Sequence, residues 1–522
     1  MSSPTLPKSS RKGRSGAIDP EERKSLLSGS DEGPSDADNF NWKETETEPD
    51  SERGWSRNRI ICSAVCLIAL LITGAFARTV FLGPAPPTHP TLLFHGDNVR
   101  SNGTHDFKRT VLIVSIDGLR ADYLDRGLTP HLLDISKQGL RAKALVPIFP
   151  RLRIQLYFSN HWALMTGLYA ESNGMVGNNF WDPVSQSEFH YNRIDSAWNP
   201  AWWLGEPMWE TAGKAGIITA NLMWPGPPKT TSGASSTYFV PWKDKVPLQE
   251  KLDQLLHWID SPFEERPQLL MMYEPSLDQA GHKAGPASAL VNKTLAQVDV
   301  FAKDLHIALQ ARNLTDIVDV VFVSDHGMTD TSHPEHIYID DILGDGYDAI
   351  EHEDGWPAMG LRFAPTANVS HNLDLLRSAA AASKGTFDVY THETMPQRYH
   401  FAHSERIAPI YVVPKIGYIL TTHAEGDVGM SKGNHGYDNA APAMHAMFVA
   451  HGPFPAVVKV LHQDLARRRL SRPNKGWHST ADDTYVMDVF PNVQIYSLVM
   501  RLLGVDNPAP TNGSAAFWDK YF

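Results

Sequence analysis

Two kinds of apolar pattern alternate along the chain after about residue 109. Residues 111–116 (VLIVSI) and 318–324 (VDVVFVS) are short, almost continuously apolar and rich in β-branched side chains. Such runs are typical of strands that are covered on both faces. Between them lie stretches such as 248–259 and 288–309, in which apolar residues recur at helical spacing. Strands that alternate with helices predict an α/β domain with a mostly parallel central sheet.

One longer apolar run stands apart from this pattern. Residues 60–77 (IICSAVCLIALLITGAFA) include no charge and begin too far along the chain for a cleaved signal peptide. The run is about as long as the shortest helix that spans a membrane. Arg53, Arg57 and Arg59 precede it and only Arg78 follows closely. The positive-inside rule therefore predicts a signal anchor with a cytosolic N-terminus and a type II, single-pass topology.

The segments on either side of this run differ in composition. Residues 1–59 are rich in Ser, Pro, Gly and mixed charge, which predicts a disordered cytosolic tail. Within the tail, Glu22 to Leu27 (ERKSLL) resembles the acidic dileucine signals read by adaptor complexes, which favours a vacuole or endosome over the cell surface. Residues 78–108 include several prolines and are expected to form a stalk. Residues 109–517 would then form the catalytic domain.

Composition narrows the function classes. The chain has 522 residues, of which 42% are apolar, so it can bury a large core and is not fibrous. Lys plus Arg total 47 against 59 Asp plus Glu, a net charge of −12, so we expect no nucleic-acid polymer as a partner. Both cysteines, Cys62 and Cys66, lie in the apolar run, which leaves the rest of the chain without disulfides or cysteine-bound zinc. Five glycosylation sequons follow the run, as a lumenal domain would allow: Asn102, Asn292, Asn313, Asn368 and Asn512.

Acidic and imidazole side chains follow the predicted strands at the point where each strand ends. Asp117 follows the first strand, and Asp325 with His326 follows the second. Ligand sites in open α/β sheets form beyond the carboxyl ends of the strands. Asp278 and His282 lie four residues apart in PSLDQAGH, so one helical turn would direct both side chains the same way.

A fourth segment, GNHGYDN, places His435 beside a glycine, where the backbone can approach a ligand closely. Together the four segments offer three carboxylates and three imidazoles, a set of ligands suited to zinc or a similar divalent cation. Six protein ligands are enough for two ions that keep open coordination positions. The sequence therefore predicts a two-metal site.

The motifs around these residues make the chain resemble a known family. From about residue 110 to 517 it is similar to the nucleotide pyrophosphatase/phosphodiesterase family (type I phosphodiesterases) of the alkaline phosphatase superfamily, and most similar to its fungal type II membrane members. The matching stretches are IDGLRADYL, NHWALMTGLYAESNGMVGNNFWDP, GEPMWETA, LDQAGHKAGP, VFVSDHGM, GNHGYDN and FPNVQIYSLVMRLLGV. The resemblance implies an alkaline-phosphatase-like central sheet sandwiched by helices.

The resemblance also implies roles for the candidate residues. It implies two Zn²⁺ ions, one held by Asp278, His282 and His435 and the other by Asp117, Asp325 and His326. Asn178 would donate a hydrogen bond to a phosphate oxygen, and Phe158 with Trp242 would stack on a nucleobase. The implied reaction passes through a phosphorylated enzyme and cleaves nucleoside triphosphates to the monophosphate and pyrophosphate, or dinucleotides and similar diesters.

The chain departs from the family pattern at the nucleophile. The usual F-P-T-L-T-F-P-N-H is replaced at residues 149–161 by FPRLRIQLYFSNH. Counting back from Asn178 places Tyr157 in the nucleophile position, yet a phenol oxygen lies well beyond a threonine hydroxyl and in-line attack tolerates little misplacement. Three explanations stay open: a misplaced exon boundary in the gene model, Ser159 as the nucleophile, or loss of turnover with retention of the metals.

Two other functions compete with a nucleotide hydrolase. The altered segment is also compatible with a catalytically impaired protein that binds metal and nucleotide. Phospholipid or phosphoethanolamine chemistry is the lesser alternative, because related transferases carry many spans after the catalytic domain and this sequence shows no second apolar run of that length before Phe522.

Overall fold

The computed structural model describes residues 66, 68, 99–149, 158–426, 431–468 and 485–522. The chain divides into two compact units, Met1–Ala85 and Pro86–Phe522, and the site lies in the second. The predicted anchor falls outside the described residues except for Cys66 and Ile68, and the adaptor signal at 22–27 and Tyr157 fall outside them as well. Within the described residues, no helix combines the length and apolar character that crossing a membrane requires.

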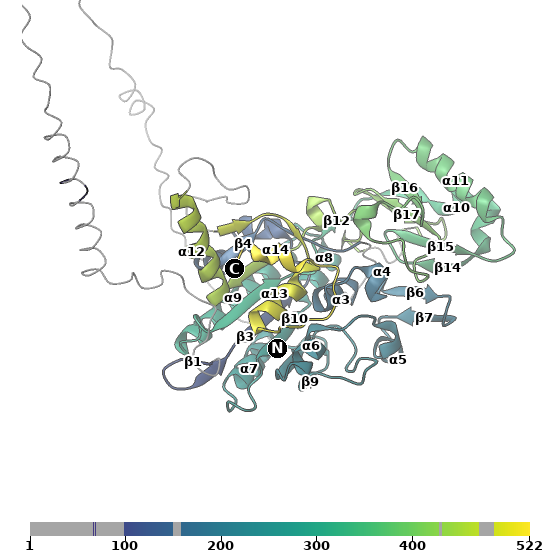
Figure 1. Ribbon diagram of the computed structural model, residues 1–522. Coiled ribbons are helices and arrows are strands. Elements are labelled where there is room, and N and C mark those ends of the chain that lie inside the picture. Colours follow the sequence, from purple (N-terminus) through teal and green to yellow (C-terminus); the bar gives the residue numbers. More distant parts are fainter. Residues whose placement is uncertain (1–65, 67, 69–98, 150–157, 427–430, 469–484) are drawn as a thin grey trace, which may run out of the picture. The chain divides into compact units, whose positions relative to one another are not determined.

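A sheet of eight strands forms the centre of the second unit (Figure 1). Strand β20 runs antiparallel to both of its neighbours, and every other neighbouring pair is parallel. The mostly parallel sheet predicted from the sequence is therefore confirmed, as are its two predicted strands, which are β3 and β11. In spatial order the strands are β21 (Tyr485–Met487), β4 (Leu140–Ala142), β20 (Phe448–His451), β11 (Val318–Val323), β3 (Thr110–Ile116), β10 (Leu269–Glu274), β8 (Thr219–Leu222) and β9 (Tyr238–Val240).

Helices cover both faces of this sheet. Because side chains alternate along a strand, Val111 and Ile113 of β3 join one apolar cluster, whereas Leu112 and Val114 join the other. The helices that contribute to the first cluster include α3 (Phe158–Thr166), α6 (Met208–Lys214), α12 (Pro453–Arg468) and α13 (Gln494–Leu503). Those that contribute to the second include α2 (Pro130–Gln138), α7 (Leu248–Ile259) and α9 (Ala289–Ala311). The two predicted helices at 248–259 and 288–309 are thus confirmed as α7 and α9.

A smaller antiparallel sheet has its own core. Its strands, in spatial order, are β14 (Ile350–Asp354), β15 (Met359–Phe363), β17 (Ile410–Pro414) and β16 (Phe387–Thr391). Helices α10 (Ile339–Leu343) and α11 (Val369–Ala382) pack with it around Leu361, Leu376 and Val412 (Figure 1). The sequence did not predict this second sheet, because all four strands have only five residues and two of them, β14 and β16, are largely half-buried or exposed.

The remaining regular elements are short. The two-stranded pairs are β1 (Val99–Ser101) with β2 (Asp106–Lys108), β5 (Leu145–Val146) with β22 (Phe490–Pro491), β6 (Asn179–Asp182) with β7 (Ser187–His190), β12 (Thr329–Asp330) with β19 (Gly433–Asn434), and β13 (Glu335–Tyr338) with β18 (Tyr418–Thr421). The remaining α-helices are α4 (Ala170–Asn173), α5 (Ile194–Ala197), α8 (Ser276–Ala284) and α14 (Ala515–Asp519).

The pair formed by β1 and β2 lies within the stretch expected to form a stalk. It is hydrogen-bonded to the domain beyond it: the Arg100 guanidinium donates to the carbonyl oxygen of Asp316 (2.7 Å), and the Asn102 side-chain amide donates to that of Arg312 (2.8 Å). Ordered contacts with the α/β domain therefore begin before residue 109.

Candidate metal centre

The predicted ligands gather at the carboxyl ends of three adjacent strands. Asp117 follows β3 directly, and Asp325 and His326 follow β11 after Ser324. Strands β3, β10 and β11 run parallel and side by side, so their ends meet at one edge of the sheet. Helix α8, which begins two residues after β10, brings in Asp278 and His282 from the same edge.

His435 reaches this edge from a distant part of the sequence. It directly follows β19, and β19 pairs antiparallel with β12, the short strand after β11. The structure therefore brings all six predicted ligands together, and every one of their side chains is buried.

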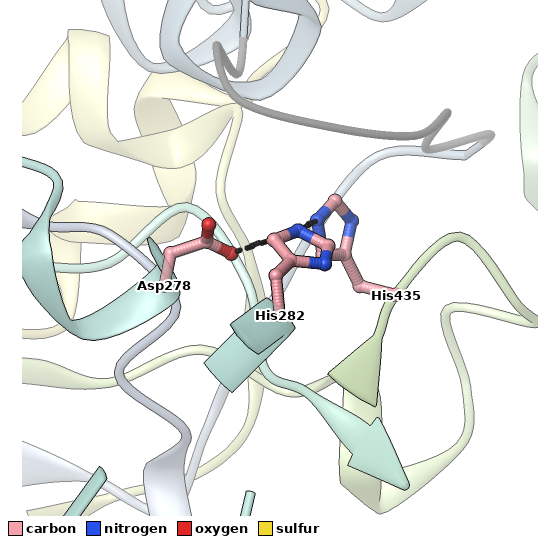
Figure 2. A group of neighbouring side chains, drawn as sticks. All are labelled: Asp278, His282 and His435. Atoms are coloured by element: carbon pink, nitrogen blue, oxygen red, sulfur yellow. Dashed lines mark hydrogen bonds and ion pairs between the residues drawn. The ribbon is translucent and has the colours of Figure 1, made fainter. Parts of the chain in front are cut away.

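The first group of candidate ligands is Asp278, His282 and His435. Figure 2 shows the imidazole of His282 between the carboxylate of Asp278 and the ring of His435. His282 Nε2 lies 3.4 Å from Asp278 Oδ1 and 3.1 Å from His435 Nε2, and His435 Nε2 lies 3.7 Å from Asp278 Oδ1. The carbonyl oxygen of Gly433, 2.8 Å from His282 Nδ1, can only accept a hydrogen bond. The ring proton of His282 therefore belongs on Nδ1, and Nε2 offers its lone pair to an ion.

The second group is Asp117, Asp325 and His326. His326 Nε2 lies 3.1 Å from Asp117 Oδ1 and 3.5 Å from Asp325 Oδ2. Its Nδ1 lies 2.5 Å from the carbonyl oxygen of Gly327, which again directs the lone pair of Nε2 into the site. Asp278 Oδ1 is 3.6 Å from His326 Nε2, so the Asp278 carboxylate adjoins both groups.

The electrostatics of this cluster fit a bound divalent cation. Burial raises the pKa of Asp117 well above its usual value, and the neighbouring carboxylates of Asp325 and Asp278 raise this pKa further. Asp117 Oδ1 is buried and accepts no hydrogen bond from any residue that the structure describes. Adjacent carboxylates in a dry site are costly unless a cation compensates their charge. Three sets of buried donors at this centre lie close enough together to hold an ion: Asp278 with His282 and His435, Asp117 with Asp278 and His326, and Asp117 with His161 and Asp325.

Two residues at this centre were not predicted from the sequence. The Tyr273 hydroxyl donates a hydrogen bond of 2.6 Å to Asp117 Oδ2, and His161 Nδ1 lies 3.4 Å from Asp325 Oδ2. Burial, followed by the charge of Asp117, raises the pKa of Tyr273, so its hydroxyl keeps the proton that it donates. The only sequence signal for Tyr273 is its place at the end of the apolar run LLMMYE, and for His161 its place in the NHWALMTG motif.

An aromatic cavity lies close to the metal centre. It has a volume of about 300 Å³, and its lining includes Tyr191, Trp198, Trp224, Phe239 and Trp242. Trp242, one of the predicted base-stacking residues, is 41% exposed, as a residue at a cavity mouth would be. The Trp224 ring meets the His161 ring edge to face at 5.3 Å, and His161 Nδ1 lies 3.4 Å from Asp325 Oδ2, so the cavity lining is connected to Asp325 through these two side chains.

Of the other residues predicted to contact the substrate or to act as the nucleophile, the structure describes only some. Asn178 is buried just before β6, and its carbonyl oxygen accepts a hydrogen bond of 3.1 Å from the backbone of the cavity residue Tyr191. Phe158 begins α3, but its side chain lies outside the described residues, and so does the whole of Tyr157. Ser159 is described and buried in the first turn of α3, two residues before His161.

Both flanks of residues 150–157 are fixed to the domain. Asn160 Oδ1 accepts hydrogen bonds from the Ile148 backbone (2.9 Å) and from the Asn492 side chain (2.7 Å). The Phe149 ring stacks on Tyr399 at 3.8 Å. The described residues on both sides of 150–157 are therefore anchored by specific contacts.

The sequons differ in exposure. Asn313, Asn368 and Asn512 are exposed, whereas Asn102 and Asn292 are half-buried. Nδ2, the atom of Asn102 to which a glycan would be joined, is hydrogen-bonded to the carbonyl oxygen of Arg312. All five stay candidate sites.

Comparison with protein families and curated proteins gives a consistent result. A family model described as type I phosphodiesterase / nucleotide pyrophosphatase matches residues 111–438. An uncharacterized pyrophosphatase/phosphodiesterase of Schizosaccharomyces pombe is 34% identical over 403 residues, which is 76% of this chain and 80% of that protein. The human ectonucleotide pyrophosphatase/phosphodiesterase family member 1 is 32% identical over 412 residues, which is 77% of this chain but only 40% of the human protein.

Solved structures agree with this result. Murine ectonucleotide pyrophosphatase/phosphodiesterase 5 has a TM-score of 0.66 and 28% identity, over 78% of this chain and 98% of that one. An inactive form of the same murine protein, solved in complex with AMP, has a TM-score of 0.65 and 27% identity, over 79% of this chain and 98% of that one. The central α/β fold of this chain is therefore shared with these proteins.

Proposed function

Because the chain belongs to the type I phosphodiesterase / nucleotide pyrophosphatase family, whose members are hydrolases of phosphodiester and pyrophosphate bonds, we propose that it is a two-metal nucleotide pyrophosphatase/phosphodiesterase. Its reaction would convert nucleoside triphosphates to the monophosphate and pyrophosphate, and would also cleave dinucleotides and similar diesters. The observation that carries this proposal is the cluster of six buried aspartates and histidines at the carboxyl ends of three adjacent strands.

Zinc is the ion that we propose for both groups. Ligand atoms at about 2.0–2.2 Å from one tetrahedral ion lie roughly 3.3–3.6 Å apart. The nitrogen–oxygen and nitrogen–nitrogen separations within the two groups, 3.1–3.7 Å, are centred on that spacing. Imidazole and carboxylate ligands without cysteine also suit zinc. Bound there, two such cations would act as Lewis acids that stabilise charge on the attacking and leaving oxygens.

The chain's own residues would bind and orient the nucleotide. The Asn178 amide would donate a hydrogen bond to a phosphate oxygen, while Trp242 and Phe158 would stack on the base at the mouth of the aromatic cavity. Base–aromatic stacking tolerates different bases, which suits an enzyme that accepts several nucleotides. The murine relative solved in complex with AMP supports a nucleotide as the substrate.

A hydroxyl near the start of α3 would attack the α-phosphorus and displace pyrophosphate, which leaves the nucleoside monophosphate esterified to the enzyme as the phosphorylated intermediate. Water would then attack the same phosphorus, release the monophosphate and restore the hydroxyl. Ser159 is one candidate for this hydroxyl, and Tyr157 stands in the nucleophile position but is disfavoured by the reach of its phenol. A misplaced exon boundary in the gene model for residues 151–159 is another explanation of the altered motif. The alternative, a catalytically impaired protein that binds metal and nucleotide, gains no support from the family comparisons.

We also propose a membrane topology and a compartment for the protein. Residues 60–77 would anchor the chain in the membrane as a type II protein, with residues 109–517 in a lumen of the secretory pathway or outside the cell. The flanking arginines and the sequons after the anchor support this topology, and the dileucine-like segment at 22–27 supports a vacuole or endosome.

The test is hydrolysis by the purified full chain reconstituted with Zn²⁺. The substrate is the p-nitrophenyl ester of thymidine 5′-monophosphate, a diester, and p-nitrophenyl phosphate is the matched monoester. We expect release of p-nitrophenol from the diester, and a loss of at least about 100-fold in kcat/KM in Asp278→Ala and His435→Ala, because each removes a ligand of the first group. His403→Ala, which changes an exposed histidine outside both groups, should retain full activity.

Each outcome has a distinct meaning. Hydrolysis that persists without metal would contradict the two-metal mechanism, and cleavage of the monoester alone would contradict the diesterase assignment. Two bound zinc ions without turnover would favour the catalytically impaired alternative. If the chain is active, Ser159→Ala and Tyr157→Phe identify the nucleophile, because only loss of the attacking hydroxyl abolishes turnover.

A further inference from the structure

Two buried side chains outside the six predicted ligands contact the carboxylates of the second group. The Tyr273 hydroxyl donates a hydrogen bond to Asp117 Oδ2, and His161 Nδ1 faces Asp325 Oδ2. Both side chains are fully buried, so water does not compete for these contacts. Each therefore acts on the orientation of one carboxylate.

The contact with Tyr273 decides which oxygen of Asp117 is available. A carboxylate has two equivalent oxygens and can turn about its side-chain bond. The hydrogen bond of 2.6 Å engages Oδ2, which leaves Oδ1 facing His326 Nε2 at 3.1 Å. Loss of the hydroxyl would free the carboxylate to turn and to present either oxygen.

The carboxylate of Asp325 is held from two directions. Its Oδ1 accepts a hydrogen bond of 3.3 Å from the Gly118 backbone. Its Oδ2 lies 3.4 Å from His161 Nδ1 and 3.5 Å from His326 Nε2. Ser115 Oγ is 2.7 Å from His161 Nε2. When Ser115 donates to Nε2, the ring proton lies on Nδ1 and points to Asp325.

The two contacts form one packed unit beneath the metal centre. Tyr273 of β10 and Ser115 of β3 are register partners in the central sheet. The His161 ring, from α3, meets the Tyr273 ring edge to face at 4.9 Å. Because three elements meet in this dry contact, the side chains are restricted to one arrangement.

From this geometry we propose that Tyr273 and His161 are positioning residues of the second ligand group. They fix Asp117 and Asp325 so that one oxygen of each faces His326, where the second metal ion binds. The inference rests on the proposed two-metal function, since it concerns how the second ion is held. Partners that orient metal ligands typically change metal affinity by about 10–100-fold when they are removed.

The test is a zinc titration of the metal-free full chain in competition with a chromophoric chelator. The unaltered chain should bind two equivalents. In Tyr273→Phe and His161→Gln, one equivalent should bind roughly 10–100-fold more weakly while the other is unchanged. Matched controls are Tyr411→Phe, which removes a buried hydroxyl from the smaller sheet, and His451→Gln, which alters a half-buried histidine outside both ligand groups; both should retain two unchanged equivalents.

The results separate this inference from the function on which it rests. Two equivalents with unchanged affinity in both variants would overturn the positioning role and leave the two-metal enzyme intact. A lower unfolding temperature of the metal-free variants with unchanged zinc affinity would assign a structural role only, and would also overturn it. An unaltered chain that binds no zinc would overturn both proposals. If Tyr273→Phe does not fold, His161→Gln decides the result alone, because it acts on a different carboxylate.

Discussion

At the scale of single residues, the candidate metal ligands could be predicted from the sequence, whereas the residues that contact and orient them could not. Asp117, Asp325 and His326 follow apolar runs that a reader of the sequence recognises as strands, so their meeting at one edge follows from parallel pairing. Tyr273 closes such a run as well, but a buried tyrosine is ordinarily a core residue. Its role depends on the pairing of β10 with β3, which places Tyr273 opposite Ser115 and beneath Asp117, and the sequence alone does not define that register.

The aromatic cavity gives a prediction at this scale. Trp242→Ala should raise KM for the thymidine diester by roughly 5–150-fold with a smaller change in kcat, because stacking on a base contributes about 1–3 kcal/mol. KM for bis(p-nitrophenyl) phosphate, which has no nucleobase, should change far less. The measurement is a pair of Michaelis–Menten curves for the two substrates. An equal loss with both would place Trp242 in general packing rather than in base recognition.

At the scale of elements, the start of helix α8 is fixed by a buried ion pair. Glu274 Oε1 accepts a hydrogen bond of 2.9 Å from the Ser276 backbone at the first turn of the helix. Glu274 Oε2 pairs with Lys251 Nζ at 2.7 Å, and Lys251, from α7, also donates to the Tyr273 carbonyl oxygen. The spacing of Asp278 and His282 predicted one helical turn, and α8 confirms it. The spacing of Asp278 and His282 could not predict the ion pair between Lys251 and Glu274, because that pair joins α7 to β10.

This ion pair gives a prediction at the element scale. Lys251→Met should lower the free energy of unfolding by about 3–5 kcal/mol, because it leaves the buried Glu274 carboxylate without its counter-charge. Lys143→Met is the control: Lys143 pairs with Asp488 at 3.0 Å, but the two side chains are 42% and 48% exposed, so its loss should cost about 1 kcal/mol or less. Urea unfolding monitored by circular dichroism measures both. In the double variant Lys251→Met, Glu274→Leu, the free energy of unfolding should recover in part, because no buried charge is left unpaired. An equal loss in the free energy of unfolding for the two lysine variants would contradict the role assigned to the buried ion pair.

At the scale of the whole molecule, the central fold was predictable and the subsidiary sheet was not. Strands β3 and β11 are nearly continuous apolar runs because helices cover both of their faces. Strands β14 and β16 include polar residues and are only partly buried, so no continuous apolar run marks them in the sequence. His435 shows the same limit: its glycine-flanked motif was recognisable, but its approach to Asp278 depends on the β12–β19 pairing of segments about a hundred residues apart.

The metal centre makes the stability of the whole domain depend on metal. The ligands lie in α8 or follow the ends of β3, β11 and β19, so each ion would link two elements of the native state and the two ions together would link four, while both bind the unfolded chain weakly. Free Zn²⁺ at 100–1,000 times its dissociation constant would add about 2.7–4.1 kcal/mol for each site. Removal of the metal with a chelator should therefore lower the unfolding temperature by several degrees, and added Zn²⁺ should restore it, as measured by differential scanning calorimetry. The variant Asp278→Ala, His435→Ala should lose part of this response, because it retains only the second ligand group. An unfolding temperature that does not change on chelation in the unaltered chain would show that these buried carboxylates are stabilised without a metal ion, and would remove the physical basis of the two-metal centre.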